Sequence, residues 1–240
     1  MSAFFAALRF LTLFPLPRRI NHSGDEVGQS AIFFPVVGLI LGLILVLVNF
    51  ALELFASAGL LSVILITLLA FMTRGLHLDG VGDTFDGLGA GGDRDRVLSI
   101  MDDSHIGVFG LVAIVLVLFL KIHALESMHV DRWRALLAAP VLGRWAMVLL
   151  AYRSKAAKAG LGSNLIDYLE TKHFLLATLL TLLSVAAILR GNGIAMIAWV
   201  ALFTIASKNY FHRRLGGITG DIFGAVGELS ETSVMVLLAL

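Results

Sequence analysis

The chain has 240 residues, of which 58% are hydrophobic and 15% are charged, and its mean hydropathy is +0.93. Soluble globular domains carry about 25% charged residues, so this composition excludes an ordinary soluble domain and predicts an integral membrane protein. The 18 basic and 17 acidic residues nearly cancel, so there is no excess charge to attract nucleic acid. Because the chain has no cysteine, any metal must be held by oxygen or imidazole ligands.

The first segment, MSAFFAALRFLTLFPLPRR, places its apolar residues before its basic ones and lacks a small-residue cleavage site. This order argues against a secretory signal peptide. The apolar residues keep helical spacing until Pro15 and Pro17 stop the helix. The segment therefore predicts an N-terminal helix that lies at the membrane interface.

Windows of about 20 mainly apolar residues are long enough to cross a bilayer. The windows that qualify are 31–52, 56–75, 107–125, 135–152, 173–190 and 192–209. A further helix from Ile222 would reach this length only by carrying Glu228 and Glu231 into the membrane, where carboxylates face the bundle interior or a wet cavity. The predicted fold is all-α, a single domain over residues 1–240. It is a polytopic membrane bundle of about six to seven transmembrane helices plus the interfacial helix.

The basic residues predict the orientation of the chain in the membrane. If the N-terminus is cytoplasmic and every window crosses, the cytoplasmic segments hold Arg9, Arg18, Arg19, Arg74, Arg94, Arg96, Arg153, Lys155, Lys158, Lys172, Lys208, Arg213 and Arg214. The opposite side holds only Lys121, Arg132, Arg134 and Arg190, and Arg144 falls within a span. This asymmetry agrees with the positive-inside rule and places the segment after the second window in the cytoplasm.

That segment, HLDGVGDTFDG, gathers three aspartates at the end of an apolar helix. If the helix continues, Asp79, Asp83 and Asp86 lie at i, i+4 and i+7, within an arc of about 60°. Three carboxylates on one stripe repel each other near lipid unless a cation neutralises them, and hard oxygen ligands suit Mg²⁺ or Mn²⁺. The alternative is a solvated loop in which Asp and Gly end a helix.

Each of the residues beside the stripe has both functional and purely structural interpretations. Arg94 and Arg96, after a glycine-rich loop, could bind phosphate or form solvated ion pairs. Asp103 with Ser104 could be ligands or the N-cap of the next helix. His77 could be a ligand, a phosphate partner or a proton carrier, or a histidine that faces lipid headgroups at a helix end.

A second acidic segment, HRRLGGITGDIFGAVGELSE, lies near the end of the chain. It contains Arg213 and Arg214, then Asp221 and Glu228 at i and i+7 on one helical face. Thr219 or Asp221 could instead cap the helix. The predicted orientation puts Asp221 on the same side of the membrane as the aspartate stripe, so we expect the two acidic sites to meet.

The segment HLDGVGDTFDGLGAGGDRDRVLSIMDDSHIGVFG closely resembles the signature segment of the cobalamin-5′-phosphate synthases, also called adenosylcobinamide-GDP ribazoletransferases. The resemblance extends to LTLFPLPRR, FFPVVGLILG and LGGITGDIFGAVGELSE. It implies a multi-pass, Mg²⁺-dependent enzyme of the bacterial inner membrane with its acidic site facing the cytoplasm. Such an enzyme joins adenosylcobinamide-GDP to α-ribazole 5′-phosphate (or α-ribazole), releases GMP and makes adenosylcobalamin 5′-phosphate (or adenosylcobalamin).

The resemblance also implies roles for individual residues. We expect Asp79 and Asp83 to bind Mg²⁺, Asp86 to be a further ligand or the base for the attacking hydroxyl, and His77 to be the alternative base. The candidate substrate contacts are Gly80, Gly87, Arg94, Arg96, Asp103, Ser104, Arg213, Arg214, Thr219, Asp221 and Glu228. Asp102 stands where the family pattern is not acidic. Expected partners are the two substrates and the lipid bilayer, with a homo-oligomer or a complex with other enzymes of the pathway left open.

Two other classes are less consistent with the sequence. A CDP-alcohol phosphotransferase expects DGxxAR, but Val81, Gly82 and Asp83 stand where xxA would, and Thr84 replaces the arginine. An isoprenoid-transferring enzyme belongs to the same class of Mg²⁺-diphosphate transferases. An ion-coupled transporter predicts acids in mid-span and inverted repeats, whereas these acids cluster at span ends and no repeat is visible.

Overall fold

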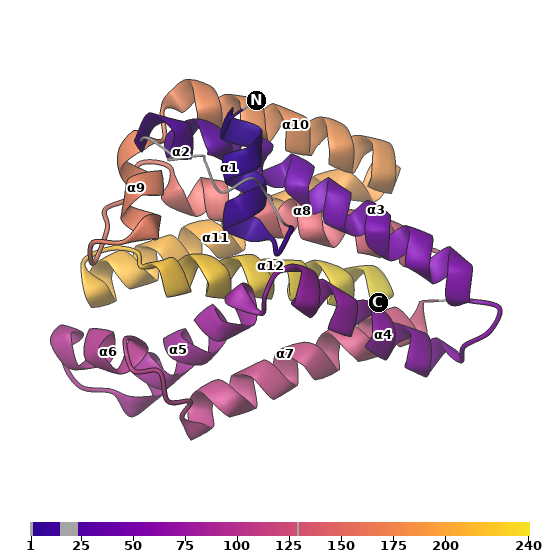
Figure 1. Cartoon of the computed structure of the whole chain (residues 1–240), viewed down its shortest axis with the longest axis horizontal. Helices are drawn as coiled ribbons and strands as arrows, with labels where there is room; N and C mark the ends of the chain where they lie inside the picture. Colours follow the sequence, from indigo (N-terminus) through magenta and orange to yellow (C-terminus); the bar gives the residue numbers. More distant parts are fainter. Residues whose placement is uncertain (1, 15–23, 129) are drawn as a thin grey trace.

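The computed structural model describes residues 2–14, 24–128 and 130–240. Over these residues the chain is helical and forms no β-strand, which confirms the predicted all-α fold (Figure 1). In chain order the elements are α1 (Ser2–Leu11), α2 (Gly24–Ser30), the 3₁₀ turn η1 (Ala31–Phe33), α3 (Phe34–Leu52), α4 (Ala58–Met72), α5 (Leu76–Ala90), α6 (Arg94–Met101), α7 (Val108–Ser127), α8 (Arg132–Ala151), α9 (Leu161–Tyr168), α10 (Thr171–Leu189), the 3₁₀ turn η2 (Arg190–Asn192), α11 (Gly193–Leu215) and α12 (Gly220–Ala239).

Several helical stretches are long and apolar enough to cross a membrane. In the described chain these are Glu26–Leu52, Val108–Ser127, Arg132–Ala151, Thr171–Leu215 and Gly220–Ala239, and the bent pair α4 and α5 would add one more. The stretch of 45 residues consists of α10, η2 and α11. Arg190 has a φ of +52° and Gly193 lies against Val185, so α10 and α11 form a hairpin. The predicted polytopic bundle is confirmed, and α12 carries Glu228 and Glu231 within a candidate span.

The helix of the second predicted window, 56–75, is α4, and it ends within the last residues of that window instead of continuing through Leu76. Arg74 and Gly75 both adopt left-handed backbone conformations, with φ of +60° and +66°. This pair ends α4, and α5 then leaves at an angle of 87° to it. The aspartates therefore lie on a separate helix rather than on a continuation of the span, although their spacing along α5 is as expected.

Helix α8 forms the centre of the bundle, with α3, α10, α11 and α12 packed around it (Figure 1). Helices α3 and α8 approach each other most closely at glycines. Helices within lipid associate mainly through tight packing of small residues. Gly38 and Gly42 on α3 lie against the backbone of Pro140 and Leu136. The core formed in this way holds α12 in a fixed position beside α5.

The loops after α5, α8 and α11 meet at one end of the bundle. Arg94 donates from Nε to the carbonyl of Leu215 and from Nη2 to the carbonyl of Ala157, each over 2.8 Å. Arg214 donates to the carbonyl of Gly92 over 2.6 Å. These bonds place the acidic segment and the start of α12 at the same end, on the left in Figure 1.

The connections from α3 to α4 and from α7 to α8 lie at the opposite end. Arg132 at the start of α8 donates to the carbonyl of Leu125 over 2.9 Å and to Oδ1 of Asn49 on α3 over 3.3 Å. Gly59 at the start of α4 lies beside Glu126 of α7. Successive spans thus run in alternating directions, as the predicted topology requires.

The expected N-terminal helix is present as α1, which packs its buried face of Ala7 and Leu11 against the bundle. Helix α1 ends at Leu11. Pro15 and Pro17, which were expected to end it, lie outside the described residues. The backbone N–H of Leu13 donates to the carbonyl of Met72 over 2.8 Å, which fixes the segment after α1 to the end of α4.

Candidate functional site

The three aspartates of α5 share one side of the helix but lie in different surroundings. Asp79 is exposed, Asp83 is partly buried and Asp86 is buried. The negative charges of Asp79, Asp221 and Asp86 all act on Asp83, and the positive charge of Lys158 opposes them. The stripe therefore forms a graded acidic surface that runs from an open cavity into the protein.

Asp86 holds the start of α7. Its Oδ2 accepts a hydrogen bond from the backbone N–H of Gly107 over 2.7 Å, and its Oδ1 accepts one from Gly110 over 2.8 Å. A Cβ at either glycine would overlap the Asp86 carboxylate. Asp86 thus satisfies amides that a helix N-terminus leaves unpaired, and its predicted roles as metal ligand or base stay predictions.

The two acidic segments meet where α5 crosses α12. A Cβ at Gly80 would lie 2.5 Å from the carbonyl oxygen of Asp221, and one at Gly224 would lie 3.3 Å from Cα of His77. Only glycine allows these helices to approach so closely. The expectation that the two acidic segments meet is confirmed for Asp221.

The other glycine of the predicted site, Gly87, lies against α6. A Cβ at Gly87 would lie 2.5 Å from Cγ of Met101 and 3.1 Å from the carbonyl oxygen of Val97. In this structure Gly80 and Gly87 bare their backbones to neighbouring helices. Their contact with a substrate stays a prediction.

Lys158, in the loop after α8, connects the acidic segments. Its ammonium group donates to Oδ1 of Asp102 and to Oδ2 of Asp221, the latter over 3.3 Å. Partial burial by itself lowers the pKa of Lys158, but the hydrogen bond and charge of Asp102 and the charge of Asp221 outweigh it, so the pKa lies above its ordinary value. Lys158 therefore stays protonated beside the carboxylates at neutral pH.

The predicted phosphate-binding arginines occupy varied positions. The donors of Arg94 are taken up by two carbonyls and by Asp95, 3.0 Å away. Arg96 is exposed. Arg213 and Arg214 line a cavity of about 460 Å³ on α11. Arg94 thus ties the loops together, and phosphate binding by these arginines stays a prediction.

The caps of the two helices that follow the acidic segments are also defined. Asp103 and Ser104 do not cap α7, because its N-cap is Gly107 and the Asp103 carboxylate accepts from the backbone N–H of His105 over 3.0 Å. The His105 ring, 2.7 Å away, lowers the pKa of Asp103 through a hydrogen bond. Thr219 is the N-cap of α12, since its hydroxyl accepts from the backbone N–H of Ile222 over 3.3 Å. The capping alternative is correct for Thr219 and wrong for Asp103.

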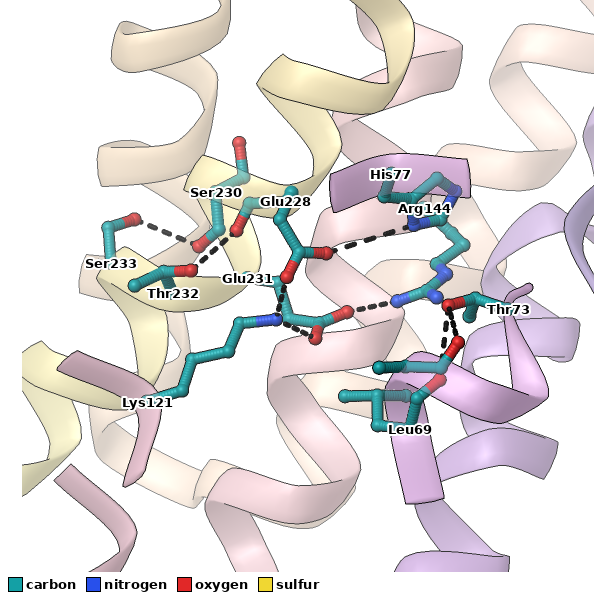
Figure 2. A network of polar contacts seen from close by, with 11 residues as sticks. Leu69, Thr73, His77, Lys121, Arg144, Glu228, Ser230, Glu231, Thr232 and Ser233 are labelled. Atoms are coloured by element: carbon teal, nitrogen blue, oxygen red, sulfur yellow. Dashed lines mark hydrogen bonds and ion pairs between the residues drawn. The ribbon is translucent and has the colours of Figure 1, made fainter. Parts of the chain in front are cut away.

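A buried ionic network lies below the acidic surface, between α7, α8 and α12 (Figure 2). Lys121 donates to Oε1 of Glu228 and, over 2.7 Å, to Oε1 of Glu231. Arg144 donates to Oε2 of Glu231. All four side chains are at most 6% exposed. Two cations and two anions offset each other inside the bundle, as intramembrane charges require.

His77 lies at the edge of this network, with Nδ1 3.9 Å from Oε2 of Glu228 (Figure 2). It is 2% exposed, and neither ring nitrogen has a hydrogen-bond partner among the described residues. Glu228 also lies in the network rather than beside Asp79. The predicted catalytic role of His77 and the substrate contact of Glu228 stay predictions.

Two cavities flank the break between α4 and α5. One, of about 610 Å³, is lined by polar groups that include Arg9, Arg74 and Asp79. The other, of about 580 Å³, is mainly apolar and shares Arg74 and Gly75 with the first. The exposed end of the aspartate stripe therefore opens into a space of the size that encloses small ligands, about 300–1,000 Å³.

The carboxylates of the aspartate stripe fit a Mg²⁺ site in which the protein supplies only one or two of the ligands. Among the described residues, no three His, Asp or Glu side chains converge on one ion. Mg²⁺, however, is usually held by one or two carboxylates together with water and substrate phosphates. Asp79 and Asp83, one helical turn apart and with neighbouring charges of the same sign, match that requirement. Asp86, with both oxygens bonded to α7, matches it less well.

Sequence reasoning missed the partners within the bundle. Lys121 was assigned to the loops opposite the acidic site, but it is fully buried in α7. A signal was present, because a lysine and Arg144 within apolar windows must find carboxylates, and Glu228 and Glu231 were the carboxylates already expected in the membrane. Gly107 and Gly110 gave no signal, since the need for them arises from Asp86, far away in sequence.

Comparison with known proteins shows which family the chain resembles over nearly its whole length. Residues 3–239 match the family described as "Cobalamin-5-phosphate synthase". An adenosylcobinamide-GDP ribazoletransferase of Geotalea daltonii is 40% identical over 242 residues, covering 100% of this chain and 98% of that protein. Similar proteins of the same name from Roseiflexus sp. and Syntrophobacter fumaroxidans are each 39% identical; the alignments cover 98% of this chain and 88% and 96% of those proteins. No solved structure matches the chain.

Proposed function

Because the chain belongs to the cobalamin-5-phosphate synthase family, we propose that it joins adenosylcobinamide-GDP to α-ribazole 5′-phosphate or α-ribazole. The products are GMP and adenosylcobalamin 5′-phosphate or adenosylcobalamin, respectively. The observation that carries this proposal is the meeting of Asp79 and Asp83 with Asp221 at one end of a membrane bundle. Relatives that match the chain over nearly its whole length bear the name of this activity.

The reaction is a displacement at phosphorus. A ribazole hydroxyl attacks the diphosphate phosphorus nearer the corrinoid, and a new P–O bond forms to that hydroxyl oxygen. The bond from this phosphorus to the bridging oxygen breaks, so that GMP leaves with the bridging oxygen. The hydroxyl proton passes to a base. Most of the catalysis in such transfers comes from positioning and electrostatic stabilisation.

Asp79 and Asp83 would hold Mg²⁺, which when bound neutralises charge on the diphosphate oxygens. Lys158 lies beside Asp83 and Asp221, so it supplies a further positive charge for the same phosphates. Asp86 is the first candidate for the base, because each carboxylate oxygen retains a lone pair after accepting one amide bond. His77, enclosed between α5 and α12, is the second.

We place the protein in the bacterial inner membrane, with the acidic surface facing the cytoplasm. The loops at that end carry Arg94, Arg96, Arg153, Lys155 and Lys158, whereas the opposite end carries Arg132, Arg134 and Arg190. Such an excess of basic residues favours the cytoplasmic side. Water-soluble nucleotides would then reach Asp79 and Asp83 from the cytoplasm.

The purified protein, incubated with adenosylcobinamide-GDP, α-ribazole 5′-phosphate and Mg²⁺, should release GMP. The corrinoid product should appear in equal amount, because every displacement yields both. GMP without the corrinoid product would indicate hydrolysis. Absence of GMP from protein that is folded by thermal-unfolding criteria would refute the proposed activity.

A further inference from the structure

Arg9 and Arg74 line the polar cavity together with Asp79. Both arginines are exposed residues, and neither has an ion-pair or hydrogen-bond partner in the part of the chain that the structure describes. The bond from Leu13 to Met72 fixes their relative positions, because it joins the segment after α1 to the end of α4. Two unpaired arginines in one cavity are suited to bind a phosphate group.

The backbone at Arg74 supports a functional reason for this arrangement. Its φ of +60° is a left-handed conformation that a side chain with Cβ rarely adopts. Glycine would fit the turn without strain, as Gly75 does beside it. Arg153 and Arg190 share this conformation, so it is the combination of the left-handed backbone with a place in the cavity lining that points to a role for the Arg74 side chain.

We propose that Arg9 and Arg74 bind the phosphate monoester of the incoming nucleotide, the 5′-phosphate of α-ribazole 5′-phosphate. This inference rests on the proposed function, which supplies the nucleotide. Asp79 lines the same cavity, so the bound phosphate belongs to a molecule that reaches the proposed metal site. The donor diphosphate then occupies the other side of the stripe, where Asp83, Asp221 and Lys158 lie.

The size and polarity of the two cavities favour the nucleotide over the corrinoid donor. The apolar cavity adjoins the phosphate site at Arg74 and includes Leu78 and Leu118, so it can accept a flat apolar base while the phosphate stays on the arginines. Cavities of about 300–1,000 Å³ enclose drug-sized ligands. A mononucleotide belongs to that class, whereas an adenosylated corrinoid attached to GDP is much larger.

The test compares binding of α-ribazole 5′-phosphate with binding of α-ribazole by isothermal titration calorimetry. The wild-type protein should bind the phosphorylated compound more tightly, and Arg74→Gly should reduce that preference by about 10- to 100-fold, the usual effect of a charged hydrogen bond. Affinity for α-ribazole should change little. Arg9→Gln should act in the same direction.

Arg190→Gly is the matched control, because Arg190 also has a positive φ, +52°, but lies at the opposite end of the bundle. It should leave the preference unchanged. If Arg74→Gly also keeps the wild-type preference, or if it weakens both compounds equally, the proposal is overturned.

A lipid headgroup is the other source of a phosphate, and nanodiscs of neutral and of anionic phospholipid distinguish it. The preference for the phosphorylated compound should be the same in both. The arginines bind lipid instead if two results occur together. The preference for the phosphorylated compound disappears in anionic lipid, and anionic lipid raises the thermal stability of the wild-type protein but not that of Arg74→Gly. Turnover is measured separately: a wild-type protein that binds with the expected preference but releases no GMP contradicts the proposed function and not the phosphate site.

Discussion

Lys121 on α7 donates to Oε1 of Glu231 on α12 over 2.7 Å, and the two side chains are 1% and 0% exposed. Isolated charges at this depth would be costly, so the arrangement is stable only as a group. Glu231 also accepts from Arg144 of α8. The contacts of Glu231 with Lys121 and Arg144 therefore fix α12 against α7 and α8, and α12 in turn places Asp221 beside α5.

Lys121→Met should destabilise the protein by about 3–5 kcal/mol, because it leaves two glutamates with one cation. Adding Glu228→Gln removes one negative charge, so the double variant should recover most of the loss. Thermal unfolding in detergent measures both effects. Lys172→Met is the control, since Lys172 is exposed and pairs with the exposed Glu170, and its effect should stay within about 0.5 kcal/mol. A double variant no more stable than Lys121→Met would contradict the charge-balance explanation.

Composition was sufficient to predict the membrane bundle, because apolar windows of span length have few other stable solutions. The break between α4 and α5 was not predicted: the sequence there has no proline, and its apolar pattern continues into Leu76 and Leu78, although Gly75 is a residue type that commonly ends a helix. The aspartate spacing was predicted correctly since it depends only on local helical geometry. The contact between Asp86 and Gly107 was not predicted, because it depends on how two helices pack.

Gly110→Ala should weaken the start of α7, because a Cβ there would displace the Asp86 carboxylate. We expect a loss of about 0.5–2 kcal/mol, the range seen when a helix cap is removed, together with a lower rate of GMP release. Gly191→Ala is the matched control, since a Cβ at Gly191 meets no atom within 4 Å. Equal unfolding midpoints for the two variants would show that the cap contributes nothing.

Lys158→Met should lower the unfolding midpoint slightly, by an amount that corresponds to about 1 kcal/mol or less, because its ion pairs are partly solvated. The pKa of Lys158 is raised in the folded protein, so its contribution is complete below the unfolded pKa of about 10.4 and is lost as pH rises through the folded pKa. Lys158 keeps its proton between about pH 6 and about pH 9, so the difference from wild type should not shrink over that range. Ionisation of Asp83, which the charge of Lys158 favours, should make the difference larger at the higher pH. Lys155→Met, at an exposed position of the same loop, should have no such effect. A difference that already shrinks between those two pH values would show that Lys158 loses its proton too early for this account.

Cysteines at positions 93 and 155 should react with an impermeant reagent only from the cytoplasmic side, since the native chain has none. Val130, 84% exposed in the connection between α7 and α8, should give the opposite result as Val130→Cys. The basic loops around Asp93 and Lys155 are the physical reason. Labelling of Asp93→Cys from outside intact cells would show that the orientation is the opposite of the predicted one.

Asp83→Asn should reduce GMP release on the order of 10²-fold or more, as the removal of one preorganised electrostatic group does. Membrane insertion should be normal, because the apolar spans are untouched. Asp95→Asn is the control, since the Asp95 side chain is 87% exposed and pairs with Arg94; it should keep most of the activity. Excess EDTA should abolish turnover in the wild-type protein, and added Mg²⁺ should restore it. Near-normal release by Asp83→Asn, or full activity in EDTA, would mean that Asp79 and Asp83 do not form a metal site.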